Sequence, residues 1–305
     1  MNLAPVIVFV YNRPEHTEKT LSSLMKNELA SESELFIFAD GIKKNATPET
    51  IEKINQTRKI IRKKQWCKKV NIIESIENKG LSISVIEGVS KIIAEFGKII
   101  VLEDDMITSP FFLQFMNDAL NVYKSTYDVA CISGYMYPVK QNLADTFFIK
   151  GADCWGWATW KRAWDNFEKD GAILLNELEQ KALTQSFDFN NSYPYTQMLK
   201  DQINGKNDSW AIRWYASAFL KNYYCLYPGI SLVENIGVDG TGIHSGTSEK
   251  WNVTLASDKI NLTPVKVEEN QLAKKSIINY FKSINKTNHS FLGKVFLKFQ
   301  TILKN

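Results

Sequence analysis

Cysteine is scarce in this chain, and no two cysteines have the spacing of a metal or disulfide motif. The four cysteines, Cys67, Cys131, Cys154 and Cys225, lie far apart along 305 residues. Zinc sites typically use C-x-x-C pairs, and disulfide-rich domains use closely spaced even sets. The sequence therefore predicts neither kind of site, and it favours a reducing, cytoplasmic setting.

A long apolar run is also missing. The apolar stretch at residues 3–11 is interrupted by Pro5, and no charged residue precedes it. A membrane-spanning helix needs about 20 apolar residues, and a signal peptide begins with a charged segment. We therefore interpret this stretch as a strand of a globular protein, for which 44% hydrophobic residues provide a substantial core.

Acidic residues are absent from the end of the chain. Residues 273–305 contain seven lysines and no acidic residue, which leaves 30 basic and 33 acidic residues elsewhere in a chain of net charge +4. The body is thus slightly acidic, and we expect no nucleic-acid partner. A basic cluster at residues 58–69 follows an amphipathic helix pattern and is interpreted as a solvated helix face.

Apolar residues recur at helical spacing between the terminal lysines, namely Ile277, Phe281, Ile284, Phe291, Val295, Phe299 and Ile302. A basic amphipathic helix suits an anionic membrane surface. We therefore expect residues 261–305 to form a helical tail that places a cytoplasmic protein on the inner face of the membrane. A helix docked on the body is the alternative.

The most informative feature that is present is an apolar run, residues 99–102, that ends in Glu103-Asp104-Asp105. Branched aliphatic residues predict a buried strand, and ligands collect outside the carboxyl ends of strands in open α/β sheets. No lysine or arginine lies within a few positions of the triplet. A divalent cation that bridges to phosphate oxygens is therefore the expected counter-charge, and a solvated acidic turn is the alternative.

Two phosphate-binding loops that could accompany such a strand do not occur. A Walker B strand of a nucleotide hydrolase requires a G-x-x-x-x-G-K-[ST] loop, and the chain has none. No G-x-G-x-x-G turn follows the first strand, which argues against a dinucleotide cofactor. What remains is a nucleotide whose phosphates are held by a metal and by side chains.

Strand and helix signals alternate over the first third of the chain. We expect strands near 5–11, 35–39, 70–75 and 99–103, separated by helices opened by Pro14 and Pro48 and by a helix near 81–96. This order predicts an α/β fold with a mostly parallel, doubly wound sheet. We expect residues 1–105 to bind a nucleotide. We expect residues 106–260 to form a lid or the acceptor half of the same domain, with helices near 110–124 and 209–222, a strand near 128–133 and aromatic-rich segments.

Several short motifs occur in one order: Val10-Tyr11-Asn12-Arg13, Ala39-Asp40-Gly41, Glu103-Asp104-Asp105, Gly156-Trp157, Asp208-Ser209-Trp210 and His244-Ser245-Gly246. In this order the chain resembles the GT-A class of nucleotide-sugar glycosyltransferases. It resembles most the N-acetylglucosaminyltransferases of N-glycan branching and family 2-like enzymes of bacterial surface polysaccharides. The resemblance implies a Rossmann-like GT-A fold and Mn²⁺ or Mg²⁺ held against the diphosphate of the donor.

The resemblance also implies roles for the donor-side residues. Asp105 would carry the metal, and Asp104 would lie by the ribose and the donor sugar. Glu103 is a donor-binding candidate beside them, and both Glu103 and Asp104 could instead orient the other ligands. Arg13 would approach the nucleotide, and Asp40 would read uracil. Each has a structural alternative, such as an Asx turn of Asp40 with Gly41. Lys79, in an Asn-Lys-Gly loop, is a further donor-binding candidate.

On the acceptor side, the resemblance assigns Asp208 as the catalytic base. Direct displacement at the anomeric carbon needs one carboxylate base, and such a reaction inverts configuration. Asp208 could instead cap the helix near 209–222. Trp157 and Trp210 are the acceptor-binding candidates, although core packing is common for tryptophans at helical spacing. His244 is a candidate second metal ligand.

These residues predict an inverting, metal-dependent glycosyltransferase that uses a nucleotide sugar, with UDP as the expected nucleotide. Its acceptor would be a saccharide or a lipid-linked saccharide of a bacterial surface glycan. Clustered carboxylates on an α/β sheet also suit a metal-dependent nucleotidyl or phosphoryl transferase. A non-catalytic scaffold at the membrane, with a degenerate nucleotide-sugar pocket, is the third interpretation.

Overall fold

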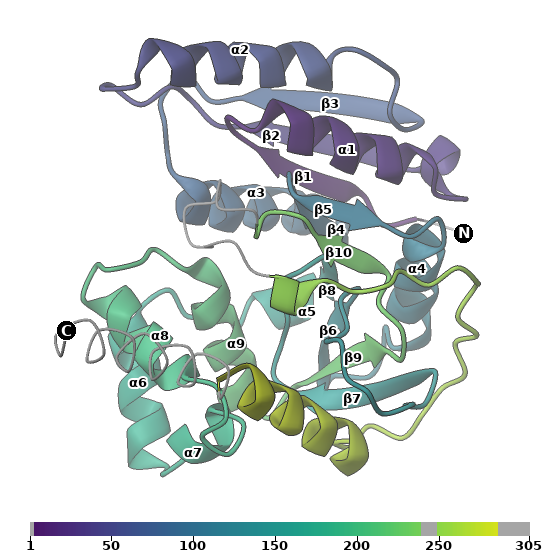
Figure 1. The fold of residues 1–305 in the computed structure, drawn as a ribbon, viewed down its shortest axis with the longest axis vertical. Coiled ribbons are helices and arrows are strands. Elements are labelled where there is room, and N and C mark those ends of the chain that lie inside the picture. Colours follow the sequence, from purple (N-terminus) through teal and green to yellow (C-terminus); the bar gives the residue numbers. More distant parts are fainter. Residues whose placement is uncertain (1–2, 239–248, 286–305) are drawn as a thin grey trace, which may run out of the picture.

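One central sheet organises the protein in the computed structural model, which describes residues 3–238 and 249–285 (Figure 1). In the described part of the chain, eight strands form this sheet in the order β3-β2-β1-β4-β8-β6-β9-β7. Six strands run in one direction, whereas β8 and β7 are antiparallel to their neighbours. The predicted α/β fold, with a mostly parallel sheet flanked by helices, is confirmed as a GT-A architecture.

The first third of the chain forms the parallel half of the sheet as predicted. Its strands are β1 (Val6–Val10), β2 (Glu34–Ala39), β3 (Lys69–Glu74) and β4 (Lys98–Glu103). They alternate with α1 (Pro14–Met25), α2 (Pro48–Ile61) and α3 (Leu81–Phe96), and a short 3-10 helix, Ala30–Glu32, precedes β2. Proline opens α1 and α2 because its missing N–H needs no partner in the first turn. Gly97 ends α3 in the left-handed conformation that favours glycine.

The second half adds antiparallel strands between and beside parallel ones. After α4 (Phe112–Val122), the strands are β6 (Val129–Ser133), β7 (Thr146–Lys150), β8 (Trp157–Trp160) and β9 (Tyr224–Pro228). Strand β8 inserts between β4 and β6 and thereby joins the two halves into one sheet. A separate two-stranded ribbon pairs β5 (Met106–Thr108) with β10 (Val233–Asn235). This ribbon begins immediately after the acidic triplet.

Helices cover both faces of the sheet (Figure 1). One apolar core lies between the sheet and α1, α2 and α4, and the other lies beneath α3 and the later helices. The later helices are α5 (Lys161–Trp164), α6 (Gly171–Gln180), α7 (Thr184–Phe187), α8 (Tyr195–Ile203) and α9 (Trp210–Leu220), and η2 (Glu249–Trp251) follows. They place many aromatic side chains against the sheet edge that carries the site.

The last described segment, residues 271–285, is a helix whose apolar face packs on the body. Ile277 and Phe281 are fully buried, and Ile284 is 9% exposed. The prediction that these residues face a membrane is therefore wrong, and the docked helix is what the structure shows. Residues 286–305, which hold the rest of the predicted tail, lie outside the described residues. Within the described ranges, no helix is long and apolar enough to cross a bilayer.

We expect Phe281→Ala to destabilise the whole domain. The Phe281 ring lies 5.1 Å from the ring of Tyr137 and 4.8 Å from that of Tyr193, between ring centroids. Deleting a buried phenylalanine typically costs about 3–5 kcal/mol because a cavity remains. Leu272→Ala, at a 53% exposed position of the same helix, should cost less than about 0.5 kcal/mol. Denaturant unfolding measures both, and equal costs would contradict the docked helix.

Candidate active site

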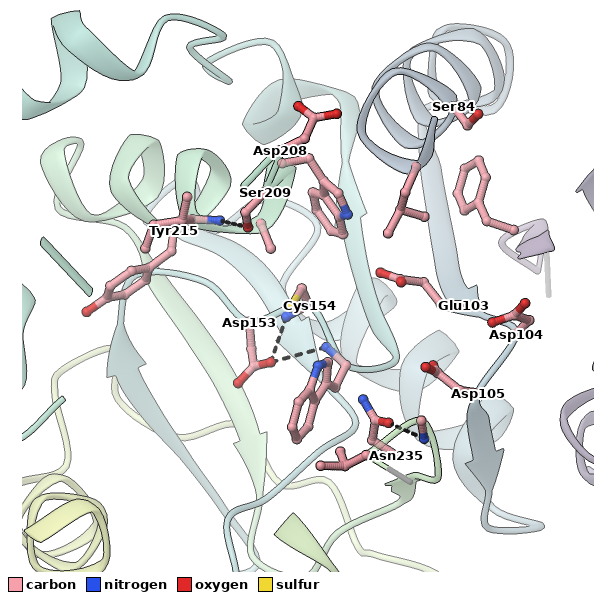
Figure 2. A pocket seen from close by; sticks show the side chains of 18 of the residues that line it. Ser84, Glu103, Asp104, Asp105, Asp153, Cys154, Asp208, Ser209, Tyr215 and Asn235 are labelled. Atoms are coloured by element: carbon pink, nitrogen blue, oxygen red, sulfur yellow. Dashed lines mark hydrogen bonds between the residues drawn. The ribbon is translucent and has the colours of Figure 1, made fainter. Parts of the chain in front are cut away.

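A cleft of about 590 Å³ opens at the carboxyl ends of β1, β2 and β4 (Figure 2). Its donor side is lined by residues that follow these strands, among them Arg13, Asp40 and the acidic triplet. Its other side is lined by residues near β7, β8 and α9, including Asp153 and Asp208. The strand order thus gathers most of the predicted site residues around one space, although they are spread over about two hundred positions of sequence.

The acidic triplet has a cationic partner that the local sequence does not contain. Because β1 and β4 are parallel neighbours, Arg13 reaches the end of β4. Its Nη1 lies 2.7 Å from Asp105 Oδ2 and 3.5 Å from Asp104 Oδ1. The triplet therefore has a counter-charge within the protein, in addition to the divalent cation that the sequence predicts.

One arginine does not neutralise three carboxylates. Burial, followed by repulsion from Asp105 and Asp104, raises the pKa of Glu103 to about 8. Burial and repulsion from Asp105 raise the pKa of Asp104 to about 7, against the opposing effect of Arg13. Both directions mean that negative charge is costly here and that a further cation would be favoured.

The free oxygen of Asp105 fits a metal that takes most of its ligands from elsewhere. Asp105 Oδ1 is buried and has no hydrogen-bond partner, which leaves it available to a cation. In residues 3–238 and 249–285, no group of three or more His, Cys, Asp or Glu side chains could hold a metal alone. Mg²⁺ commonly binds one or two carboxylates together with substrate phosphates and water. The predicted ligand His244 lies outside the described residues.

Gly237 brings the chain into close contact with Asp105. A Cβ atom at this position would lie only 2.0 Å from Asp105 Oδ2. The β5–β10 ribbon aligns the segment, and the Gly237 N–H donates to Asn235 Oδ1 over 2.8 Å. The absence of a side chain at Gly237 therefore allows its backbone to lie against Asp105 at the end of β4.

Asp40 is held by four hydrogen bonds. Its Oδ1 accepts from the N–H groups of Gly41 and Lys79, and its Oδ2 accepts from Asn78 Nδ2 and the Gly80 N–H, all at 2.8–2.9 Å. The structural role of Asp40 with Gly41 is therefore present, and it extends to the loop before α3. A base could contact Asp40 only by replacing one of these donors, so its role in reading uracil stays a prediction.

Lys79 does not extend into the cleft. Its Nζ pairs with Glu87 Oε2 at 2.6 Å on the exposed side of α3, and Lys79 is absent from the residues that line the cleft. In this structure, the backbone N–H of Lys79 donates a hydrogen bond to Asp40 Oδ1. Direct donor binding by the Lys79 side chain is therefore not supported by its position.

Asp208 does not cap α9. The cap is Ser209, whose Oγ accepts from the Ile212 N–H at 3.2 Å, so the capping alternative for Asp208 is wrong. The Asp208 side chain is 66% exposed and lines the cleft. Figure 2 shows it on the opposite side of the open space from Asp105, with Glu103 between them. An exposed carboxylate in this place can receive a proton from a bound hydroxyl.

Arg213 fixes the segment that carries Asp208. Its guanidinium donates to the Ser209 carbonyl, to the Lys169 carbonyl and, over 2.6 Å, to Ser82 Oγ. Its Nη2 also lies 3.7 Å from Asp208 Oδ1. Because Ser82 belongs to α3, Arg213 joins the donor side of the cleft to the start of α9.

Trp157 is a core residue, and the prediction that it stacks on the acceptor needs correction. It is fully buried and packs against Trp164, Trp210 and Trp214 at centroid distances of 5.4–5.9 Å. Trp210 is 2% exposed but reaches the cleft wall, and its hydrogen bond to Glu103 opposes the rise in the pKa of that carboxyl. The structure thus gives Trp210 a contact with the acidic triplet, and its acceptor role stays a prediction.

Asp153 and the tyrosines around it also line the cleft, and no sequence motif predicts them. Asp153 Oδ1 accepts from the N–H groups of Cys154 and Trp155, and Asp153 Oδ2 accepts from the Tyr227 hydroxyl at 2.9 Å. Burial raises the pKa of Asp153, and these donors oppose the rise. The available signal was an aspartate shortly after a β-rich run and directly before Cys154-Trp155. It could not reveal the tyrosine partner 74 positions away.

The sequence matches a known protein family. The model of the family described as "Glycosyl transferase family 2" matches residues 6–164, which include β1, the acidic triplet and β8. No curated protein matches the chain.

Two solved structures of S. aureus TarS are similar in part. One is 17% identical over 43% of this chain and 21% of that chain, with a TM-score of 0.29. The other, of residues 1–349, is 15% identical over 50% of this chain and 41% of that chain, with a TM-score of 0.31. The matches therefore span less than half of either TarS chain.

Proposed function

The chain belongs to glycosyl transferase family 2, and from this premise we propose that its cleft transfers a sugar from a nucleotide sugar to a saccharide acceptor. One observation carries the proposal. The cleft places a buried carboxylate oxygen without a partner, Asp105 Oδ1, opposite an exposed carboxylate, Asp208. The Asp105 oxygen could bind a cation that stabilises the diphosphate leaving group, and the Asp208 carboxylate could accept the proton of an acceptor hydroxyl.

On the donor side, Asp105 would hold the divalent ion, and family 2 enzymes commonly depend on such an ion. When bound, Mn²⁺ or Mg²⁺ would stabilise the negative charge that develops on the departing diphosphate. Arg13 would pair with a phosphate oxygen, since its guanidinium already lies at the acidic end of β4. The loop organised by Asp40 would contact the nucleoside, for which we propose uridine.

On the acceptor side, Asp208 would take the proton of the attacking hydroxyl. A base opposite the leaving group favours a single displacement, and a single displacement inverts the anomeric configuration. Arg213 would hold the Asp208 segment in place. We propose an acceptor on a bacterial surface glycan, either free or linked to a lipid.

The test is the release of nucleoside diphosphate from a panel of nucleotide sugars with Mn²⁺. We expect slow release of UDP without acceptor, its loss with a chelator, and its recovery on adding Mn²⁺ or Mg²⁺. Release of pyrophosphate or monophosphate would favour a nucleotidyl or phosphoryl transferase. Absence of both binding and release for every donor would refute the proposal.

The lysines that follow the docked helix are the residues of the predicted tail that could contact a membrane. We propose that the lysines at 286, 294, 298 and 304 attract an anionic membrane surface, each with roughly 1 kcal/mol when near it. A variant that ends at residue 285 keeps the docked helix and should sediment less with anionic vesicles than the full chain does. Neutral vesicles are the control. Equal sedimentation of the two proteins would refute this role.

A further inference from the structure

The acceptor side of the cleft ends in a chamber of aromatic rings. Six residues line it, and we call them the aromatic chamber: Tyr137, Trp155, Tyr193, Tyr195, Tyr227 and Trp251. All lie after the acidic triplet in sequence, and Phe281 of the docked helix packs against Tyr137, Tyr193 and Trp251. Aromatic faces bind the C–H surfaces of sugar rings by apolar contact, and tyrosine hydroxyls can bond to sugar hydroxyls.

Asp153 gives this chamber a negative charge. Its two oxygens accept the Cys154 and Trp155 N–H groups and the Tyr227 hydroxyl, and the Tyr137 hydroxyl lies 3.5 Å from Oδ2. Burial raises the pKa of Asp153, and these four donors oppose the rise because they favour the ionised carboxylate. Among the residues that the structure describes, no lysine, arginine or histidine forms a salt bridge with Asp153.

In the part of the chain that the structure describes, the cleft is lined by six carboxylates but only three cationic side chains, Arg13, Lys43 and Lys150. Of these, Arg13 already pairs with Asp105 and Asp104. Glu103 and Asp208 line the same cleft as Asp153. Lys150 also lines the cleft, but its Nζ donates to Asn222 Oδ1 at 2.7 Å and lies over the Phe219 ring. The faces of aromatic rings are themselves electronegative. An anionic group that entered the chamber would therefore meet a negative charge in a poorly hydrated space.

We propose that the aromatic chamber binds the acceptor sugar, that this sugar carries no carboxylate or phosphate, and that Asp153 determines this selectivity. The proposal rests on the proposed function, because it assigns the substrate class of the same cleft. Asp153 acts here as a specificity-determining residue. Its hydrogen bonds orient Tyr227 toward the cleft, and its charge excludes acid sugars.

The test compares neutral glycosides with their acid counterparts by saturation-transfer NMR. The probes are methyl glucoside and methyl galactoside and the corresponding methyl uronides, which differ only by a carboxylate. We expect the neutral glycosides to bind the wild-type protein at least about 10-fold more tightly than the uronides do, because placing like charges close together in a binding site costs binding free energy. This comparison needs neither a variant nor turnover.

Asp153→Asn tests the residue itself. In this variant, the neutral glycoside should bind less than about 3-fold more tightly than the uronide. Tyr227→Phe removes one hydroxyl but keeps the Asp153 charge, so the affinity difference between the two probes should remain. Asp145→Asn is the matched control, because Asp145 is exposed at the other end of β7 and does not line the cleft. It should change nothing.

Three results would overturn the inference: uronides that bind as tightly as neutral glycosides, no binding of any neutral glycoside, or an unchanged affinity difference in a folded Asp153→Asn protein. UDP release from a donor without acceptor, measured on the same preparation, tests the proposed function separately. If UDP is released but neutral glycosides are not bound in preference to uronides, only the inference about Asp153 and the chamber is refuted. Selective binding of neutral glycosides without any release would refute the transferase proposal, and the chamber would then be a binding site for neutral sugars but not for an acceptor.

Discussion

Asp105→Asn is expected to abolish Mn²⁺-dependent donor binding and to lower sugar transfer by roughly 10²- to 10³-fold, which corresponds to several kcal/mol of transition-state stabilisation. Asparagine is nearly isosteric with aspartate. It therefore preserves the shape that Gly237 approaches while it removes the charge. The Asp105 oxygen without a partner is the feature of the described residues that best suits a cation, so we expect the effect to appear in binding as well as in rate.

Calorimetry of UDP binding, with and without Mn²⁺, measures this directly. Asp118→Asn is a matched control, because Asp118 lies on α4, away from the cleft, where it accepts from Gln114. The control should keep both binding and transfer. Metal-dependent UDP binding that survives in Asp105→Asn would show that the ion is held elsewhere, and the site assignment would then be lost.

The parallel half of the fold could be predicted because its signals are local. Pro14 and Pro48 mark the starts of two helices, and Gly97 marks the end of a third. The run that ends at Glu103 is buried along its length because strands flank it on both sides. Each of these helix boundaries, and the strand itself, can be predicted from fewer than about ten neighbouring residues, a range over which sequence patterns are informative.

The antiparallel insertions could not be predicted in the same way. Strand β8 (Trp157–Trp160) is four residues long and fully buried, so it has no alternating pattern of exposed and buried side chains. Its tryptophan spacing also suits a helix. Its place between β4 and β6 depends on pairings with residues about 30 and 60 positions away. Such contacts are set by tertiary packing rather than by local preference.

The site shows the same division between local and distant information. The carboxylates at the ends of strands were found because their positions follow from strand boundaries. Arg13 was named as a nucleotide contact, but its pairing with Asp105, 92 positions away, was not. Sequence alone also could not decide between Asp208 and Ser209 as the cap of α9, because both residue types are favourable caps. Hydrogen-bond geometry decides it for Ser209.

Because Ser209 rather than Asp208 caps α9, the carboxylate of Asp208 is available for proton transfer. Asp208→Asn is expected to lower transfer by roughly 10²-fold or more, since asparagine cannot accept a proton from the acceptor. Donor binding should persist, because the Asp208 side chain is 66% exposed and its ion-pair partner is Arg213 rather than a donor-side residue. The measurements are the transfer rate with saturating donor and the Kd of UDP with Mn²⁺.

Ser209→Ala separates a chemical role of Asp208 from a structural one. It removes the observed cap, which should cost about 1 kcal/mol of stability, but it leaves the carboxylate at position 208 in place. If the site acts through proton transfer, Ser209→Ala will be less stable with nearly normal transfer, and Asp208→Asn will be normally stable with little transfer. The reverse pattern would mean that the start of α9 matters only for folding, and the catalytic base would have to be sought among the other carboxylates of the cleft.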